Sequence, residues 1–300
     1  MAAGVTGTAQ IDQAVKKFLA ESRYTLQERP GVLKSHIRVE TLPENFGPSV
    51  NIPKFNTVTT YALTEGVDMA QSQQITDTSM TLTPAEYGAQ VILTDMNLME
   101  ARDDFFQVAG RILGDSFDRQ QDQTLCDDCT NFSVQLGGAG TALFFGHVMA
   151  AHAGIVYNAP ADATAGRGGE PGPDPIFAAF TPMTWHSALK GLSGAVQAVG
   201  IAGQATIPQP KDLVNEYNLA GVSIVTDINF NKNTSDDVDS LVASKEAWIL
   251  VTLGDEMDAE QERDSSLRAW EVNIVGRWAR GEYNDGWGRG MTFDSSAPTG

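Results

Sequence analysis

Hydrophobic and polar residues alternate in two neighbouring stretches, and this pattern predicts a long β-hairpin. The stretch 55–63 alternates first, a polar stretch 65–74 interrupts it, and alternation returns over 80–93. The Thr, Tyr and Val residues in these stretches favour strands. An isolated two-stranded hairpin is marginally stable in water, and this one has too few apolar residues on either face to form its own core. We therefore expect the hairpin to lie on another molecule.

The clearest helical pattern begins after Thr94 and Asp95, which are good N-cap residues, and continues to about Cys126. Such a helix spans on the order of 45 Å, so we expect a spine that lies across a sheet. Residues 1–10 are expected to form a flexible tail, and 11–22 a short amphipathic helix. Apolar residues recur along the spine every three to four positions: Leu98, Phe105 or Phe106, Ala109, Ile112 or Leu113, and Phe117.

The other periodic stretches predict a mixed α+β fold. The nearly continuous apolar run 247–254 is typical of a central strand. A tight turn at 284–286 is expected to return the chain into a second strand at 287–293, and the Gly/Pro-rich segment 161–175 is expected to be a mobile surface loop. We expect further strands at 36–43, 220–230 and 270–278, and helices within 137–160 and 182–199.

Charge and composition narrow the classes of function. The chain has 300 residues, a formal net charge of −18 and a pI of about 4.5. This balance argues against a dedicated nucleic-acid binder, which needs Lys and Arg at phosphates, and against docking on an anionic membrane. No secretory signal is visible at the N-terminus, and no apolar run approaches the roughly 20 residues of a membrane span. Only two cysteines occur, so we expect no disulfide framework and a reducing cytosol.

Cys126, Cys129, His147 and His152 form one constellation that resembles a metal site. Two thiolates and two imidazoles suit tetrahedral zinc, which leaves a zinc-dependent enzyme as an alternative reading. However, 17 residues separate Cys129 from His147, which exceeds the usual zinc-finger spacing. The favoured prediction is that the two thiols are structural and that the chain binds no metal and no cofactor. No Ser-His-Asp or Cys-His catalytic set can be assembled, so we expect no enzyme and no catalytic residues.

Three segments together resemble the major capsid proteins of tailed bacteriophages, which have the Hong Kong 97-type shell fold. "IPKFNTVTTYALTEGVD" (52–68) is similar to the first arm of that family's extended loop. "MTLTPAEYGAQVILTDMNLMEARDDFFQ" (80–107) resembles the return arm and the entry to the spine helix. "SLRAWEVNIVGRWARGEYNDGWG" (266–288) is similar to the closing strand pair. The order and spacing of these segments, over about half of the chain, carry the resemblance.

The resemblance implies an α+β fold with a peripheral and an axial domain. The spine helix and the long strands would build the peripheral domain, and the axial domain would meet its copies at the capsomer centre. The implied boundaries are an N-terminal arm (1–25), the first part of the peripheral domain (26–49), the extended loop (50–92), the spine helix (93–135), the axial domain (136–261, including loop 161–175), and the closing strands of the peripheral domain with the C-terminal tail (262–300).

The resemblance also implies a function: noncovalent self-assembly into the hexamers and pentamers of an icosahedral head that encloses double-stranded DNA without reading its sequence. The chain would assemble in the host bacterial cytoplasm and end in the virion capsid, with a portal, a separately encoded scaffolding protein and a cement protein as further partners. An encapsulin-like compartment shell is an alternative with the same fold. The extended loop would reach over a neighbouring subunit, with contacts from Phe55, Tyr61, Leu63, Met80, Leu82 and Tyr87.

Some members of that family join a loop Lys to an Asn of a partner. Between Phe55 and Gly88 this sequence contains no Lys, and Lys54 lies at the base of the loop. We therefore expect no isopeptide cross-link.

Overall fold

The computed structural model describes residues 5–6, 32–43, 47, 49–55, 58, 60–69, 72–100, 105–158, 169–189, 218–219, 221–254 and 257–297. The predicted helix 11–22, most of the loop 161–175 and the second half of the helix 182–199 lie outside these residues. Within the expected tail, Val5 and Thr6 form a short strand, β1, that pairs with the strand β5 (Ala85–Thr94), so the tail is not wholly irregular. Within the described part of the chain, no helix has the length and apolar character that a membrane span needs.

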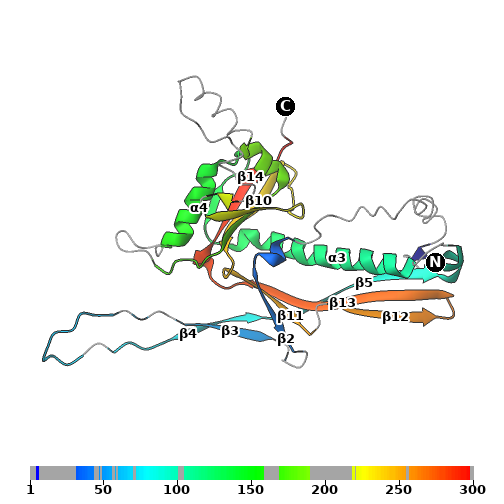
Figure 1. The fold of residues 1–300 in the computed structure, drawn as a ribbon, viewed down its shortest axis with the longest axis horizontal. Coiled ribbons are helices and arrows are strands. Elements are labelled where there is room, and N and C mark those ends of the chain that lie inside the picture. The colour runs from blue at the N-terminus through cyan, green and yellow to red at the C-terminus, as the bar shows by residue number, and fades with distance from the viewer. Residues whose placement is uncertain are drawn as a thin grey trace, which may run out of the picture.

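The longest strands of the first sheet run along the long axis of the molecule (Figure 1). Its strand order is β1-β5-β13-β11-β2, and β12 pairs with the outer half of β13. As the apolar run predicts, β11 is an interior strand. The strands are β1 (Val5–Thr6), β2 (Arg38–Leu42), β5 (Ala85–Thr94), β11 (Trp248–Leu253), β12 (Asp258–Asp264) and β13 (Ala269–Glu282). The acidic sequence of β12, exposed along nearly its whole length, gave no sign of a strand.

The predicted spine helix exists and lies across this sheet (Figure 1). It is α3 (Phe105–Asp127), preceded by α2 (Asp95–Glu100) and followed by the 3-10 turn η2 (Asp128–Asn131). Ala109, Leu113 and Phe117 recur every four residues and are buried against β5 and β13, whereas Ile112 faces outward. The apolar stripe continues at Leu125, where the helix passes from the first sheet to a second sheet, described next.

A second sheet with helices on it forms a separate layer beside the spine helix (Figure 1). Its strand order is β6-β14-β10-β7-β9-β8. The strands are β6 (Gln135–Gly137), β7 (Ile176–Phe180), β8 (Asn218–Leu219), β9 (Val222–Thr226), β10 (Asp237–Ser244) and β14 (Gly288–Asp294). The helix α4 (Phe145–Tyr157) packs on this sheet through Val148, Ala151 and Ile155. A further helix occupies 182–189 after Thr181, whose Oγ1 accepts the backbone N–H of Thr184 at 3.3 Å.

The predicted closing hairpin is wrong in its pairing. The turn after β13 contains the short 3-10 helix η3 (Asp285–Trp287), and its Asn284 side chain accepts the Gly286 N–H. Beyond this turn β14 does not return along β13 but enters the second sheet between β6 and β10. The chain therefore joins the two sheets here. The turn sequence indicated that the chain reverses direction, but it did not determine which strand β14 would pair with.

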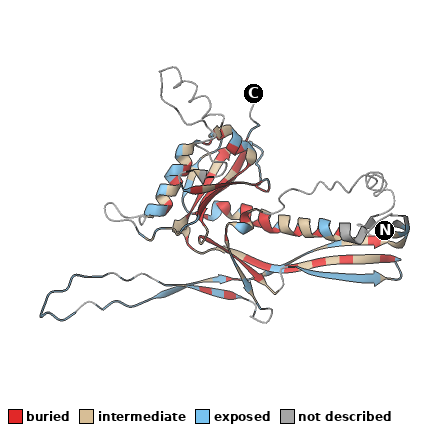
Figure 2. Cartoon of the chain, in the orientation of Figure 1, coloured by how far each residue is buried: buried red, intermediate tan, exposed pale blue. Residues whose placement is uncertain are grey.

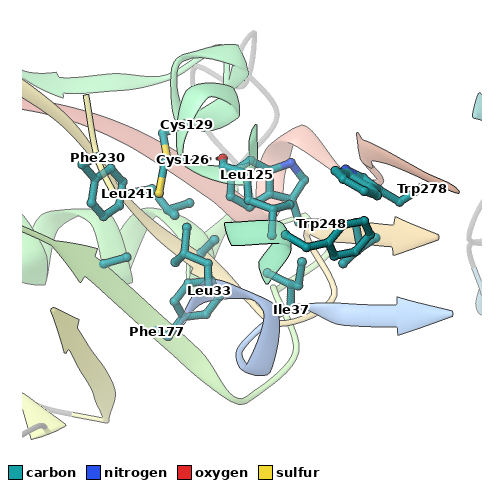
Figure 3. Close-up of a cluster of buried hydrophobic side chains, with 14 of the residues drawn as sticks. Leu33, Ile37, Leu125, Cys126, Cys129, Phe177, Phe230, Leu241, Trp248 and Trp278 are labelled. Atoms are coloured by element: carbon teal, nitrogen blue, oxygen red, sulfur yellow. Dashed lines mark hydrogen bonds between the residues drawn. The ribbon is translucent and has the colours of Figure 1, made fainter. Parts of the chain in front are cut away.

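Both sheets contribute to one core beneath the spine helix. Figure 3 shows Leu33, Ile37, Leu125, Phe177, Leu241 and Trp248 converging from the N-terminal segment, the spine helix and both sheets. Leu33 lies in the 3-10 turn η1 (Leu33–Ser35), just before β2. Because one continuous apolar cluster spans both sheets, the spine helix fixes them relative to each other.

Candidate functional site

The extended loop projects away from the other described parts of the chain (Figure 1). It begins and ends in a separate two-stranded sheet, β3 (Val50–Phe55) paired with β4 (Asp77–Leu82). The described residues between these strands, 58, 60–69 and 72–76, carry no strand and project far from both sheets (Figure 1). The sequence therefore predicted a projecting loop in this region, but it placed the paired arms over 55–63 and 80–93, whereas the structure pairs 50–55 with 77–82. It also extended the loop to residue 92, whereas residues 85–94 form β5 of the first sheet and pair with β13.

Large apolar side chains are exposed along this loop. Figure 2 colours most of the described residues of the loop as exposed. Each is more than half exposed, with values from 53% at Tyr61 to 67% at Ile75. Scattered single hydrophobic residues are normal on a protein surface, but a run of them on a projecting segment marks an interaction surface. The side chains of this surface, called here the loop surface, are Phe55, Val58, Tyr61, Leu63, Val67, Met69 and Ile75.

The base of the loop is anchored to its own chain. Ile52 and Leu82 are buried against Ile249 and Val251 of β11. Gly281 makes this approach possible, because a Cβ at that position would lie 2.5 Å from a methyl carbon of Leu82. The loop is therefore held firmly at its root while its outer part projects away from both sheets (Figure 1).

The six residues predicted to contact a neighbour divide into two sets. Phe55, Tyr61 and Leu63 belong to the loop surface, and their role between subunits stays a prediction. Leu82 is buried by its own chain and has no surface to offer, while Met80 packs beside it. Tyr87 lies on β5 and stacks on the Trp278 ring with centroids 3.8 Å apart. These three residues alternate as a strand does, but their apolar face turns toward this chain's own core.

The predicted contacts missed four of the seven residues of the loop surface: Val58, Val67, Met69 and Ile75. Val67, Met69 and Ile75 lie in or beside the stretch 65–74, which was interpreted as polar. This stretch shows neither the strand period nor the helix period. The signal that could have found them is the presence of large apolar residues in a segment with no predicted fold partner.

A pair of carboxyl groups lies near the base of the loop, at the end of β13. Burial, together with the neighbouring Asp285 carboxylate, raises the pKa of Glu282 to about 7. The pKa of Asp285 is lowered despite its partial burial, because Ser133 N–H donates to it at 2.7 Å. Glu282 therefore holds the proton of the pair near neutral pH.

We expect Glu282→Gln to stabilise the chain at pH 8 and to have little effect at pH 4.5. A raised carboxyl pKa means that the folded state binds the proton more tightly than the unfolded state, so stability falls as pH rises from 4.5 to about 7. Glutamine keeps the hydrogen-bonding shape without the charge. Urea unfolding at the two pH values measures the difference, and an equal effect at both would contradict it. The matched control is Glu260→Gln on the exposed strand β12, where no change is expected.

The four residues of the predicted alternative zinc site do not assemble. Cys129 is fully buried in the apolar core, and its Sγ lies 4.0 Å from the Leu125 carbonyl oxygen. His147 accepts the Phe144 N–H on its Nδ1 at 3.2 Å and packs on the Phe293 ring. Among the described residues, which include all four, the one group of three potential ligands is Asp122, Cys126 and Asp227. Only Cys126 is common to both sets.

Comparisons with known proteins identify structures that share this fold. No protein-family model matches the chain, and no curated protein matches it. Solved structures do match over almost its whole length. The Ralstonia phage GP4 capsid has 12% identity and a TM-score of 0.68, with 88% of each chain covered. The head of Helicobacter pylori bacteriophage KHP40 has 10% identity and a TM-score of 0.67, covering 87% of this chain and 89% of the other. The capsid of cyanophage P-SCSP1u has 14% identity and a TM-score of 0.62, with 89% of each covered.

The chain therefore has the shell fold of tailed-phage capsid proteins, as the sequence resemblance implied. The elements that define it are the projecting loop, the long spine helix on a sheet with the long strand β13, and the second sheet with its helices.

Proposed function

We propose that this chain is the shell subunit of a tailed-phage head, assembling noncovalently into hexamers and pentamers around double-stranded DNA. The observation that carries the proposal is the loop surface: a firmly anchored projection with exposed apolar side chains, on a fold shared with solved capsids. An apolar ribbon that its own chain does not cover gains its burial from a neighbouring copy. In an assembled shell, the apolar side chains that stay exposed on the folded subunit are buried against a neighbouring copy.

Charge supports a container rather than a nucleic-acid binder. The net charge of −18 disfavours tight contacts to phosphate, so the DNA is held by confinement and remains free to be packaged and ejected. Like charge between copies is screened over about 10 Å at 0.1 M salt, which leaves short-range apolar contacts to decide assembly. A scaffolding protein, a portal and a cement protein are further partners that this role requires or accommodates, and assembly would take place in the host cytoplasm.

The side chain of Lys54 favours a noncovalent shell. Its ammonium group lies over the ring of Trp287, 5.9 Å from the centroid, at the root of the loop. A lysine held there by a cation–π contact is remote from the exposed end of the loop, where a cross-link to a neighbour would form.

Electron microscopy of the full chain expressed alone tests the proposal. We expect closed or partly closed shells, or separate capsomers, in negatively stained samples at moderate salt. Light scattering on the same samples should show large assemblies that grow with protein concentration. A compact monomer that persists at high concentration, with the loop protected from proteolysis, would overturn the proposal.

A further inference from the structure

A polar group lies buried where the spine helix meets the second sheet. Asp122 and Cys126 are one helical turn apart on α3, and Asp227 directly follows β9. All three are at most 3% exposed, and one ligand atom from each lies within 4.8 Å of the others. The second cysteine, Cys129, which Figure 3 labels together with Cys126, is outside this group of three.

The hydrogen bonds of the group leave its negative charge without a cation. Asp122 accepts the Leu33 N–H on Oδ1 at 2.8 Å and the Asn229 Nδ2–H on Oδ2 at 2.9 Å. Asp227 accepts the Asn229 N–H on Oδ1 at 2.9 Å, while no N–H or hydroxyl of a described residue donates to its buried Oδ2. Burial and the direct contact with Asp227 raise the pKa of Asp122. None of the ion pairs between described residues includes either carboxyl group.

Two buried carboxyl groups that face each other at this distance require a positive charge between them, either a proton or a metal ion. A bare carboxylate in such a place is costly, because burial removes its hydration. Burial, together with the neighbouring Cys129 and the two carboxyl groups, raises the pKa of the Cys126 thiol, so this thiol is protonated when no metal is bound.

We propose that Asp122, Cys126 and Asp227 bind a divalent transition metal, with Zn²⁺ as the best match, in a closed structural site. Zinc accepts both thiolate and carboxylate ligands and favours four-coordinate structural sites. Asn229 donates its backbone N–H to Asp227 and its side-chain N–H to Asp122, and its amide oxygen provides a fourth ligand if the amide is turned so that this oxygen faces the ion. Binding releases the Cys126 proton to solvent as the thiolate coordinates the ion.

The site would connect three parts of the fold. Asp122 and Cys126 belong to the spine helix, Asp227 to the second sheet, and the Leu33 N–H bonded to Asp122 to the segment before β2. Because the group is buried, the ion would hold these parts together and would not act on a substrate. The inference does not depend on the proposed shell function.

Metal analysis of the full chain, produced in zinc-supplemented medium and desalted, tests the proposal. We expect stoichiometric zinc in the unmodified chain and in the control Cys129→Ala, and a loss of most of it in Cys126→Ser and Asp227→Asn. Cobalt in place of zinc should give a thiolate-to-metal charge-transfer absorption that Cys126→Ser abolishes. A chain without bound zinc under these conditions would overturn the proposal and leave a shared proton between the two carboxyl groups.

Thermal unfolding with zinc or with EDTA separates metal loss from misfolding. The unmodified chain should melt at a lower temperature in EDTA, while Asp227→Asn should melt at the same temperature in both. The asparagine variant is nearly isosteric and removes one buried charge, so it is expected to fold. The site would be contradicted if EDTA did not change the melting temperature of the unmodified chain. It would also be contradicted if EDTA lowered the melting temperature of Asp227→Asn as much as that of the unmodified chain.

Discussion

A chain with Leu63→Ser, Val67→Ser and Met69→Ser is expected to fold normally and to form no closed particles. The three side chains are 65% to 67% exposed, so each replacement should change subunit stability by less than about 0.5 kcal/mol. If a neighbouring subunit buries these side chains, their replacement weakens the association free energy by on the order of 5 kcal/mol for each loop. Every subunit of a shell loses this amount. Electron microscopy counts the particles, and urea unfolding follows the subunit.

A matched control lies in the same loop. Thr64→Ser and Gln74→Ser change exposed polar residues of the same projecting segment and should leave particle formation intact. Normal particles from the triple variant would show that the loop surface is not the contact that assembly needs. A triple variant that fails to fold would contradict the exposure of these side chains.

Trp278→Ala is expected to cost about 3–5 kcal/mol of unfolding free energy, the usual range for emptying a buried tryptophan site. The side chain is 2% exposed on the long strand β13. Its ring stacks on Tyr87 of β5 and meets Phe117 of the spine helix edge-on at 4.9 Å, so it joins helix to sheet. Removing it leaves a cavity below the spine helix, and urea unfolding of the purified subunit measures the loss.

Two further variants make this prediction specific. Trp278→Phe should cost clearly less, because the smaller ring keeps most of the aromatic contact and removes a buried indole N–H that has no hydrogen-bond partner among the described residues. Ile112→Ala, on the outer face of the spine helix and 52% exposed, should cost less than about 0.5 kcal/mol. If Trp278→Ala lowered the unfolding free energy as little as Ile112→Ala does, the Trp278 ring would not be what connects helix and sheet.

Strong local periodicity made the spine helix and the central strand predictable. Ala109, Leu113 and Phe117 repeat at the spacing of one helix face, and the apolar run of β11 is buried along nearly its whole length. The strands β10 and β12 were not predicted. The first mixes Asp and Ser with buried Val and Leu, and the second is acidic and exposed, so neither shows the alternation or the apolar run that indicates a strand.

The amino-acid sequence by itself determined two elements: the spine helix, from its apolar spacing, and the projecting loop, from a long segment with too few apolar residues to form a core. Only the tertiary structure decided the pairings between distant segments. It took β14 into the second sheet, buried Leu82 against β11, and brought Asp227 to Asp122 and Cys126. These contacts join residues from about 45 to 170 positions apart in the chain. No local pattern encodes them, because their energy comes from burial and charge that exist only when both sides are in place.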